Sequence, residues 1–153
     1  FVEHANREVF EEAVSVAASF ACTVQTQESL LDLLFVGAEA YCFTAGRGLG
    51  HTEQMLEVLA SVGVCREKGF DALEHLVLDH VEAVSGCICV LLAWNERRRK
   101  FVEQLRALGV PVLVLVIVEA GGAKERDAGP LRDDPASFHV LEVGAIAEGL
   151  AKL

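Results

Sequence analysis

The chain has 153 residues, of which 52% are hydrophobic, and its formal net charge is −10 at neutral pH. This length suits one domain with a hydrophobic core of its own. The acidic excess disfavours nucleic acid as a partner, because a phosphate backbone repels negative charge. The apolar runs are far shorter than the roughly 20 residues of a membrane-spanning helix, so we expect no membrane span here.

The cysteines and the first residue suggest where the protein is found and how the chain begins. The cysteines are odd in number and lie mostly in apolar stretches: Cys22, Cys42, Cys65, Cys87 and Cys89. This usage is typical of buried free thiols in a reducing compartment and predicts a cytoplasmic protein. The chain starts at Phe1 without a leader, so we expect a single domain over residues 1–153 that is truncated at its N-terminus.

The first half of the chain predicts helices around a pair of strands. Apolar residues at helical spacing, with early glutamates, predict a helix over residues 5–24. The runs Leu30–Val36 and Glu39–Thr44 are joined so tightly that only antiparallel strands fit. Thr52 is expected to cap the next helix, which precedes a loop at Gly63–Gly69. Two helical faces are predicted, one with Met55, Leu56, Leu59 and Val62, the other with Phe70, Leu73, Leu76, Val77, Val81 and Val84.

The second half predicts a parallel sheet. Cys87–Ala93 and Val110–Val118 are nearly continuous apolar runs. They are separated by a helix that ends at Gly109 and bears the apolar residues Phe101, Val102, Leu105 and Leu108. Strands without polar alternation are covered on both faces, so we expect both in the middle of the sheet. Phe138–Val143 is predicted as a last strand and Ala145–Leu153 as a closing helix. The predicted fold is an α/β three-layer sandwich with a mainly parallel central sheet and an antiparallel strand pair.

The connection before the last predicted strand is long. Residues 119–137 are rich in Gly, Asp and Pro, and we expect a functional or disordered loop there.

The order of elements resembles the von Willebrand factor A-like fold, a Rossmann-like architecture. Short stretches are also similar to the bacterial domain of unknown function 58 family, over roughly residues 8–118. These stretches are residues 10–19, Leu33–Gly37, Gly46–Leu49, Leu56–Ala60 and Gly109–Val116. The resemblance implies a non-catalytic adaptor that works beside AAA+ ATPases of the MoxR type, in a full-length protein that is often anchored by upstream membrane helices.

The resemblance also bears on metal binding. The wider fold holds a divalent cation such as magnesium through an Asp-x-Ser-x-Ser loop, a Thr from a second loop and an Asp from a third. Here the first loop would precede Phe1, Cys65–Gly69 offers no Thr, and Trp94-Asn95-Glu96 stands where an Asp is expected. We therefore expect no metal unless an upstream segment supplies ligands.

The resemblance also implies that the sheet lacks a central strand upstream of Phe1. The neighbouring strands would then expose unpaired backbone groups. This predicts a homodimer or strand exchange in this chain.

A basic cluster, Arg97–Lys100, opens the helix that follows the strand at Cys87. Cations in a first helical turn oppose the helix dipole, and such a broken rule can mark function. We hypothesise that this cluster docks an acidic partner segment at the carboxyl edge of the sheet. The expected partner-binding residues are Arg47, Thr52, Asn95, Glu96, Arg97 and Arg98. The alternative is a capped, solvated helix start, with Asn95 as N-cap and Glu96 paired with Lys100.

Other motifs give weaker signals for chemistry. Gly46–Gly50 precedes a helix and could bind a phosphate, although it matches neither a P-loop nor a dinucleotide motif. The alternative function is thus a doubly wound nucleotide- or phosphate-ligand-binding enzyme domain, with Asp127–Asp134 as a lid. Cys87 and Cys89 share one strand face, where apolar neighbours favour buried thiols over a metal site. His75 and His80 are five residues apart, a spacing that does not suit a shared metal.

No serine nucleophile motif is found, and no cysteine stands beside a His and carboxylate set. The sequence therefore favours a protein-interaction module over an enzyme.

Overall fold

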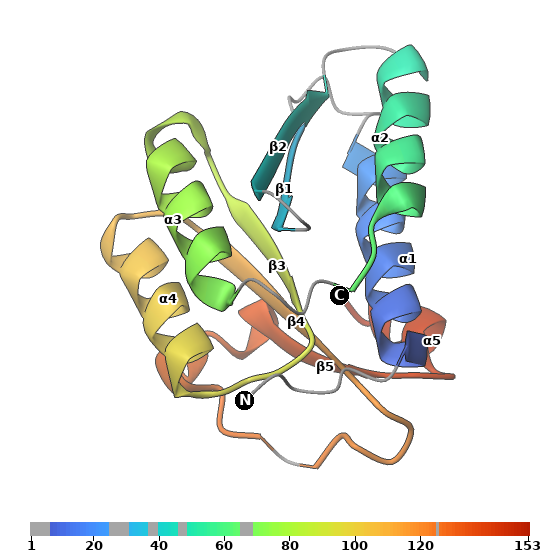
Figure 1. Cartoon of the computed structure of the whole chain (residues 1–153). Coiled ribbons are helices and arrows are strands. Elements are labelled where there is room, and N and C mark those ends of the chain that lie inside the picture. Colours follow the sequence, from blue (N-terminus) through green and yellow to red (C-terminus); the bar gives the residue numbers. More distant parts are fainter. Residues whose placement is uncertain (1–6, 25–30, 37–39, 46–48, 65–68, 125) are drawn as a thin grey trace. The chain divides into compact units, whose positions relative to one another are not determined.

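The computed structural model describes residues 7–24, 31–36, 40–45, 49–64, 69–124 and 126–153, and shows an α/β protein (Figure 1). Its described residues form two compact units, one of residues 14–80 and one of residues 7–13 with 81–153. Each unit is described by itself below. The expectation of a single domain over residues 1–153 stays a prediction.

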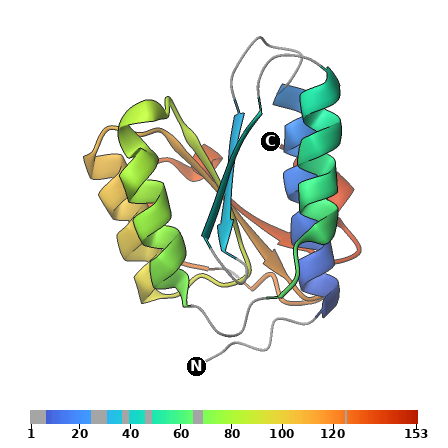
Figure 2. The ribbon, with the colours of Figure 1, turned by 45° about the horizontal axis from the view of Figure 1, so that its top comes forward.

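The first unit is built around an antiparallel strand pair. Its elements are α1 (Arg7–Val24, from Val14 onward), β1 (Leu31–Val36), β2 (Ala40–Ala45), α2 (Leu49–Ser61) and α3 (Phe70–His80). Leu33 is opposite Phe43 in the β1–β2 register. Figure 2 shows this pair between α3 and the two helices α1 and α2. The predicted antiparallel pair is therefore confirmed.

The core of the first unit forms where α1, α2 and the strand pair meet. Ala21, Met55 and Leu59 are buried. Their partly buried neighbours come from α1 and from one face of the strands: Val14, Ala17, Ala18, Leu33 and Phe43. Helical spacing on α1 and α2 thus provides apolar stripes that cover one face of the pair.

Two helix boundaries in this unit differ from the prediction. Thr52 does not cap α2, because the helix begins three residues earlier at Leu49. A capping preference is a local tendency, and the backbone at Leu49 and Gly50 is already helical. The helix α3 ends at His80, and Val81 lies in the 3₁₀ turn η2 (Val81–Ala83) that follows.

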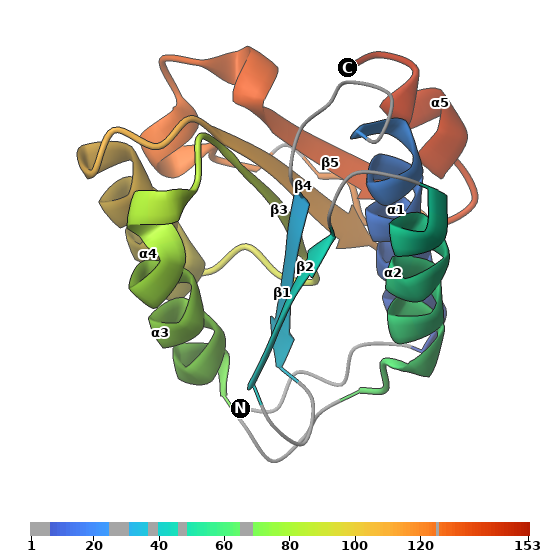
Figure 3. The same cartoon turned by 90° about the horizontal axis from the view of Figure 1, so that it is seen from above.

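The second unit contains a three-stranded parallel sheet in the order β3-β4-β5 (Figure 3). Its elements are β3 (Cys87–Leu91), α4 (Glu96–Ala107), β4 (Val112–Val118), the 3₁₀ turns η3 (Gly129–Leu131) and η4 (Pro135–Ser137), β5 (Phe138–Glu142) and α5 (Ile146–Leu150). Cys89 is level with Val114, and Val116 with Val140. The predicted parallel strand, helix, strand unit is confirmed.

The core of the second unit centres on β4. The four residues from Val114 to Ile117 are 0% exposed, so both faces of this strand are covered. On α4, Phe101, Val102 and Leu105 form the buried stripe. An uninterrupted apolar run therefore does correspond to a fully covered strand at β4.

The second apolar strand occupies a different position. Within the described sheet β3 lies at an edge, and its Ile88 is 39% exposed. The expectation that both apolar strands lie in the middle is wrong for β3, since an apolar run indicates average burial and not position in a sheet.

The helices of this unit are shorter than predicted. Leu108 is the exposed C-cap of α4, and Gly109 takes a positive φ of 80° just beyond it. The closing helix covers only Ile146–Leu150. In the described part of the chain, no helix combines the length and apolar character needed to span a membrane.

Candidate functional site

The helix α4 begins at the carboxyl edge of the parallel sheet, because it follows β3 directly. Asn95 adopts extended backbone angles, and its side-chain Oδ1 accepts a hydrogen bond of 3.2 Å from the Arg98 backbone N–H. This bond satisfies one of the free N–H groups of the first turn. The N-cap interpretation of Asn95 is confirmed. The cap fixes where α4 begins and thus where the basic cluster lies relative to the sheet.

The basic cluster Arg97–Lys100 is partly paired within the chain. Glu96 Oε1 lies 3.7 Å from Lys100 Nζ one turn along α4, as the i, i+4 interpretation predicted. Arg99 Nη1 lies 3.8 Å from the Asp127 carboxylate. Both pairs are at the surface, where water and salt weaken the attraction. These two ion pairs therefore orient Lys100 and Arg99 but leave much of the positive potential of the cluster in place.

Asp127 gathers several donors around one carboxylate. Arg132 Nη2 donates to Asp127 Oδ1 at 2.8 Å, and the Gly129 backbone N–H donates to the same oxygen at 3.1 Å. These two hydrogen bonds, that from Arg132 foremost, hold the pKa of Asp127 below its ordinary value. The same contact raises the pKa of Arg132. Asp127 is thus ionised at neutral pH and fixes the turn that follows it.

The connection Asp127–Leu131 is held along α4. Trp94 Nε1 donates to the Asp127 backbone oxygen at 2.8 Å, and Arg106 Nη1 donates to the Pro130 oxygen. Leu131 is buried. The contacts explain why this stretch, which we expected as a loop or a lid, forms an ordered turn against the helix.

Gly129 marks the closest approach in this connection. Its φ is +57°, and a Cβ added there would lie 3.2 Å from Arg99 Cδ. Glycine suits both requirements, since it adopts positive φ without strain and has no side chain.

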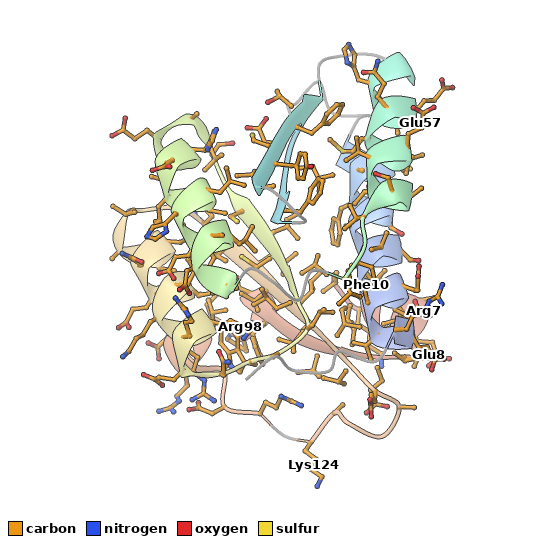
Figure 4. The ribbon with its side chains drawn as sticks, viewed as in Figure 1. Arg7, Glu8, Phe10, Glu57, Arg98 and Lys124 are labelled. Atoms are coloured by element: carbon orange, nitrogen blue, oxygen red, sulfur yellow. The ribbon has the colours of Figure 1, made fainter. Side chains whose placement is uncertain are left out.

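The start of the long connection is attached to the end of β5. The Glu142 carboxylate accepts hydrogen bonds from the backbone N–H groups of Ala123 at 2.8 Å and Gly121 at 3.3 Å. Figure 4 shows Lys124 directed away from the sheet. The carboxyl edge is therefore bordered by backbone turns that side chains hold in place.

The charge at the start of α4 contrasts with that of the whole chain. Its five cations, Arg97, Arg98, Arg99, Lys100 and Arg132, exceed the three carboxylates, Glu96, Asp127 and Asp133, by two charges, whereas the chain carries −10. A local excess of this kind attracts groups of opposite charge. We call this group of eight residues the α4 basic site.

The structure places the expected partner-binding residues in different parts of the chain. Asn95, Glu96, Arg97 and Arg98 lie together at the start of α4, where Figure 4 labels Arg98. Thr52 lies inside α2 in the first unit, and Arg47 lies outside the described residues. Residues 46–48 of the glycine loop are also outside them.

Sequence reasoning placed Arg99 in the basic cluster but did not join Asp127 and Arg132 to it. A local signal did exist for Asp127. An Asp two residues before a Gly-Pro pair is typical of a turn in which the carboxylate accepts a backbone N–H. Its pairing with Arg99 had no local signal, because the two residues are far apart in the chain.

The cysteines follow the prediction only in part. Cys87 and Cys89 share one face of β3, with their sulfurs 3.6 Å apart. Cys22 and Cys42, which were expected to be buried, are exposed free thiols, and Cys65 lies outside the described residues. Over the residues that the structure describes, no group of three or more His, Cys, Asp and Glu side chains could hold a metal.

Comparisons with models of protein families, with curated proteins and with solved structures found no match to this chain.

Proposed function

We propose that this chain is a non-catalytic protein-interaction module that binds an acidic segment of a partner protein at the α4 basic site. The observation that carries the proposal is the excess of two positive charges at the α4 basic site, in a chain with a net charge of −10. Electrostatic complementarity of this kind steers association and selects partners.

The position and the rigidity of the site support the same function. Ligands of open α/β sheets commonly bind outside the carboxyl ends of the strands, where α4 begins. Asn95 caps the helix, and Asp127 and Glu96 orient Arg99 and Lys100. A preorganised cationic surface loses less conformational entropy on binding than free arginines would.

The fold that we propose is a three-layer, von Willebrand A-like sandwich. It is supported by the antiparallel pair β1–β2, which precedes the parallel β3, α4, β4 unit. The partner expected from the resemblance is an AAA+ ATPase of the MoxR type, acting with this chain in the cytoplasm. Binding of magnesium, as in the wider fold, is expected only if upstream residues supply the ligands.

The free edge of β3 is consistent with the additional strand that the resemblance places upstream of Phe1. In the described sheet β3 pairs with β4 and with no other strand, so its second edge can accept another. A second copy of this chain is the other expected source of that strand. Monomeric behaviour in light scattering at high concentration would count against a homodimer.

The test compares two charge-reversal variants with the same change in net charge. Arg97→Glu/Arg98→Glu alters the α4 basic site, and Lys124→Glu/Lys152→Glu alters two exposed lysines of the same unit. Binding of a fluorescent Asp/Glu-rich peptide, and of the MoxR-type ATPase, is measured by anisotropy at several salt concentrations. We expect roughly tenfold or greater weakening for the arginine variant alone, since close charge pairs contribute on the order of 1.5 kcal/mol or more.

Equal weakening in the two variants would indicate a nonspecific charge effect and contradict the proposal. Binding that is insensitive to both variants would contradict it as well. The nucleotide-binding alternative stays a prediction, because residues 46–48 of its glycine loop lie outside the described residues.

A further inference from the structure

Two thiols lie together on β3, away from the residues of the α4 basic site. Cys87 Sγ and Cys89 Sγ are 3.6 Å apart on the same face of the strand. Cys89 is 7% exposed, whereas Cys87 is half-buried. Cys87 is thus the less buried of the two thiols, and Cys89 lies beside it in the interior.

We propose that Cys87 and Cys89 form a redox-active dithiol, in which Cys87 is the attacking thiol and Cys89 the resolving thiol. The oxidant is a low-molecular-weight disulfide. The Cys87 thiolate attacks one of its sulfurs, which forms a mixed disulfide and releases one thiolate. Cys89 then loses its proton and attacks Cys87 Sγ, which forms the Cys87–Cys89 disulfide and releases the second thiolate. Two electrons and two protons leave the protein and reduce the oxidant to two thiols.

The asymmetry of the two thiols supports these roles. The hydrogen bond between the two thiols lowers the pKa of Cys87 against the opposing effect of its burial, while the same contact and burial raise the pKa of Cys89. The thiolate is the nucleophile in thiol chemistry, so Cys87 reacts first. Cys89 stays protonated until a mixed disulfide forms beside it.

The strand geometry places the two Cα atoms farther apart than in most disulfides, near the upper end of the usual range. Residues two apart on a strand are separated by about 6.6 Å between Cα atoms. Relaxed disulfides have Cα separations of roughly 4.4–6.8 Å, most often about 5.5–6 Å. A slight local shortening of the strand would bring the Cα atoms to the commonest separation as the sulfurs close from 3.6 Å to bonding distance.

The position of β3 allows this shortening. In the described sheet the strand is held by a single ladder, which pairs Cys87 with Val112 and Cys89 with Val114. An edge strand can bend there at the cost of one ladder, whereas a central strand such as β4 would disturb two. Oxidation is therefore expected to loosen the first residues of the β3–β4 ladder.

The test uses the full chain with Cys22, Cys42 and Cys65 replaced by Ser, which leaves only the proposed pair. The protein is equilibrated with mixtures of reduced and oxidised glutathione containing a chelator. It is then quenched with acid, alkylated with iodoacetamide and weighed intact. We expect both thiols to disappear together in one two-electron transition that dithiothreitol reverses. Two alkylatable thiols in every mixture, or separate glutathione adducts on both, would overturn the proposal.

Two further variants of this protein separate the roles. Cys89→Ala is expected to accumulate the Cys87–glutathione mixed disulfide, because the resolving thiol is gone. In Cys87→Ala, the remaining Cys89 is expected to be alkylated roughly tenfold more slowly than Cys87 is in Cys89→Ala. Equal rates would overturn the assignment, and circular dichroism confirms that each variant is folded.

A metal site is the competing outcome. Tetrahedral zinc with Zn–S bonds of about 2.3 Å would hold two sulfurs about 3.8 Å apart, close to the observed separation. The protein with only these two cysteines is therefore also incubated with zinc chloride and dialysed. One zinc ion retained per chain, with both thiols protected from glutathione disulfide, would overturn the redox proposal in favour of a metal site.

Discussion

The strand β4 and the connection Asp127–Leu131 both lie against α4, but different interactions hold them there. Val114–Ile117 of β4 are completely buried and have no polar side chain. The connection has one buried apolar side chain, Leu131, and is otherwise held through Asp127, whose side chain is 46% exposed, and through hydrogen bonds to backbone oxygens. Apolar burial thus stabilises the sheet, while polar contacts at the surface shape the α4 basic site. We therefore expect changes in β4 to affect stability most and changes in the connection to affect it least.

The largest expected effect is that of removing a side chain from β4. Leu115→Ala leaves a cavity at a position that is 0% exposed, and such losses cost about 2–5 kcal/mol. Urea unfolding followed by fluorescence of Trp94, the single Trp of the chain, reports on the second unit. The unfolding midpoint is expected to fall while its steepness is unchanged.

Ile88→Ala on β3 is the matched control. Ile88 is 39% exposed, so its truncation is expected to cost about 1 kcal/mol. If the two variants lost equal stability, the contrast between a covered central strand and an open edge strand would be wrong.

The contrast between these strands also shows how far the sequence determines the fold. The apolar runs at Cys87 and Val110 predict two parallel strands joined by a helix, and the structure has them. Their composition is too alike to distinguish the covered strand from the edge strand. That difference arises because β5 pairs with β4 and not with β3. This pairing joins distant parts of the chain, and neither apolar run contains a signal for it.

An intermediate loss of stability is expected for Gly129→Ala in the connection Asp127–Leu131. Alanine there must adopt a positive φ, which costs about 1 kcal/mol, and its Cβ would lie 3.2 Å from Arg99 Cδ. Gly109→Ala provides the control, because Gly109 also has a positive φ but has no heavy atom within 4 Å of the added Cβ. The difference between the two free energies of unfolding therefore isolates the contact with Arg99.

We expect Gly129→Ala to be the more destabilising by a few tenths of a kcal/mol, since Arg99 is flexible and can move aside. A shifted Arg99 would also weaken its pair with Asp127, and hydrogen exchange at residues 127–131 would rise. Unchanged exchange would show that Arg99 does not help to hold the connection.

The candidate site is less predictable from sequence than the fold. Asn95 precedes an apolar-striped helix and could be assigned as its cap, and the Glu96–Lys100 pair follows from helical spacing. The Thr52 cap was wrong, because the same local rule was applied to a residue that the helix already contains. Asp127 joins Arg99 to Arg132 only after the chain has formed β4 and returned along α4. Such contacts depend on the assembled sheet, which no short motif encodes.

The smallest expected effect on stability is that of Asp127→Asn. Unlike the effects of the other substitutions, it should depend on pH. The pKa of Asp127 is lower in the folded protein than in the unfolded chain, so its carboxylate contributes stability above the unfolded pKa. This contribution is lost as the pH falls through the folded pKa. We expect Asp127→Asn to lower the melting temperature by at most a few degrees at neutral pH. The difference from the unmodified protein should shrink to nothing in strong acid.

Asp79→Asn, an exposed residue of α3 in the first unit, removes the same charge without touching the connection. Thermal unfolding of the three proteins between neutral and strongly acidic pH makes the comparison. If Asp79→Asn reproduced the acid-dependent difference, net charge would account for it. A difference confined to Asp127→Asn requires the contacts of this carboxylate with Arg132, Gly129 and Arg99, because these are weakened when it is neutral. The polar contacts that shape the α4 basic site would then be responsible for a small, pH-sensitive share of the stability, separate from the share that the apolar burial of β4 provides.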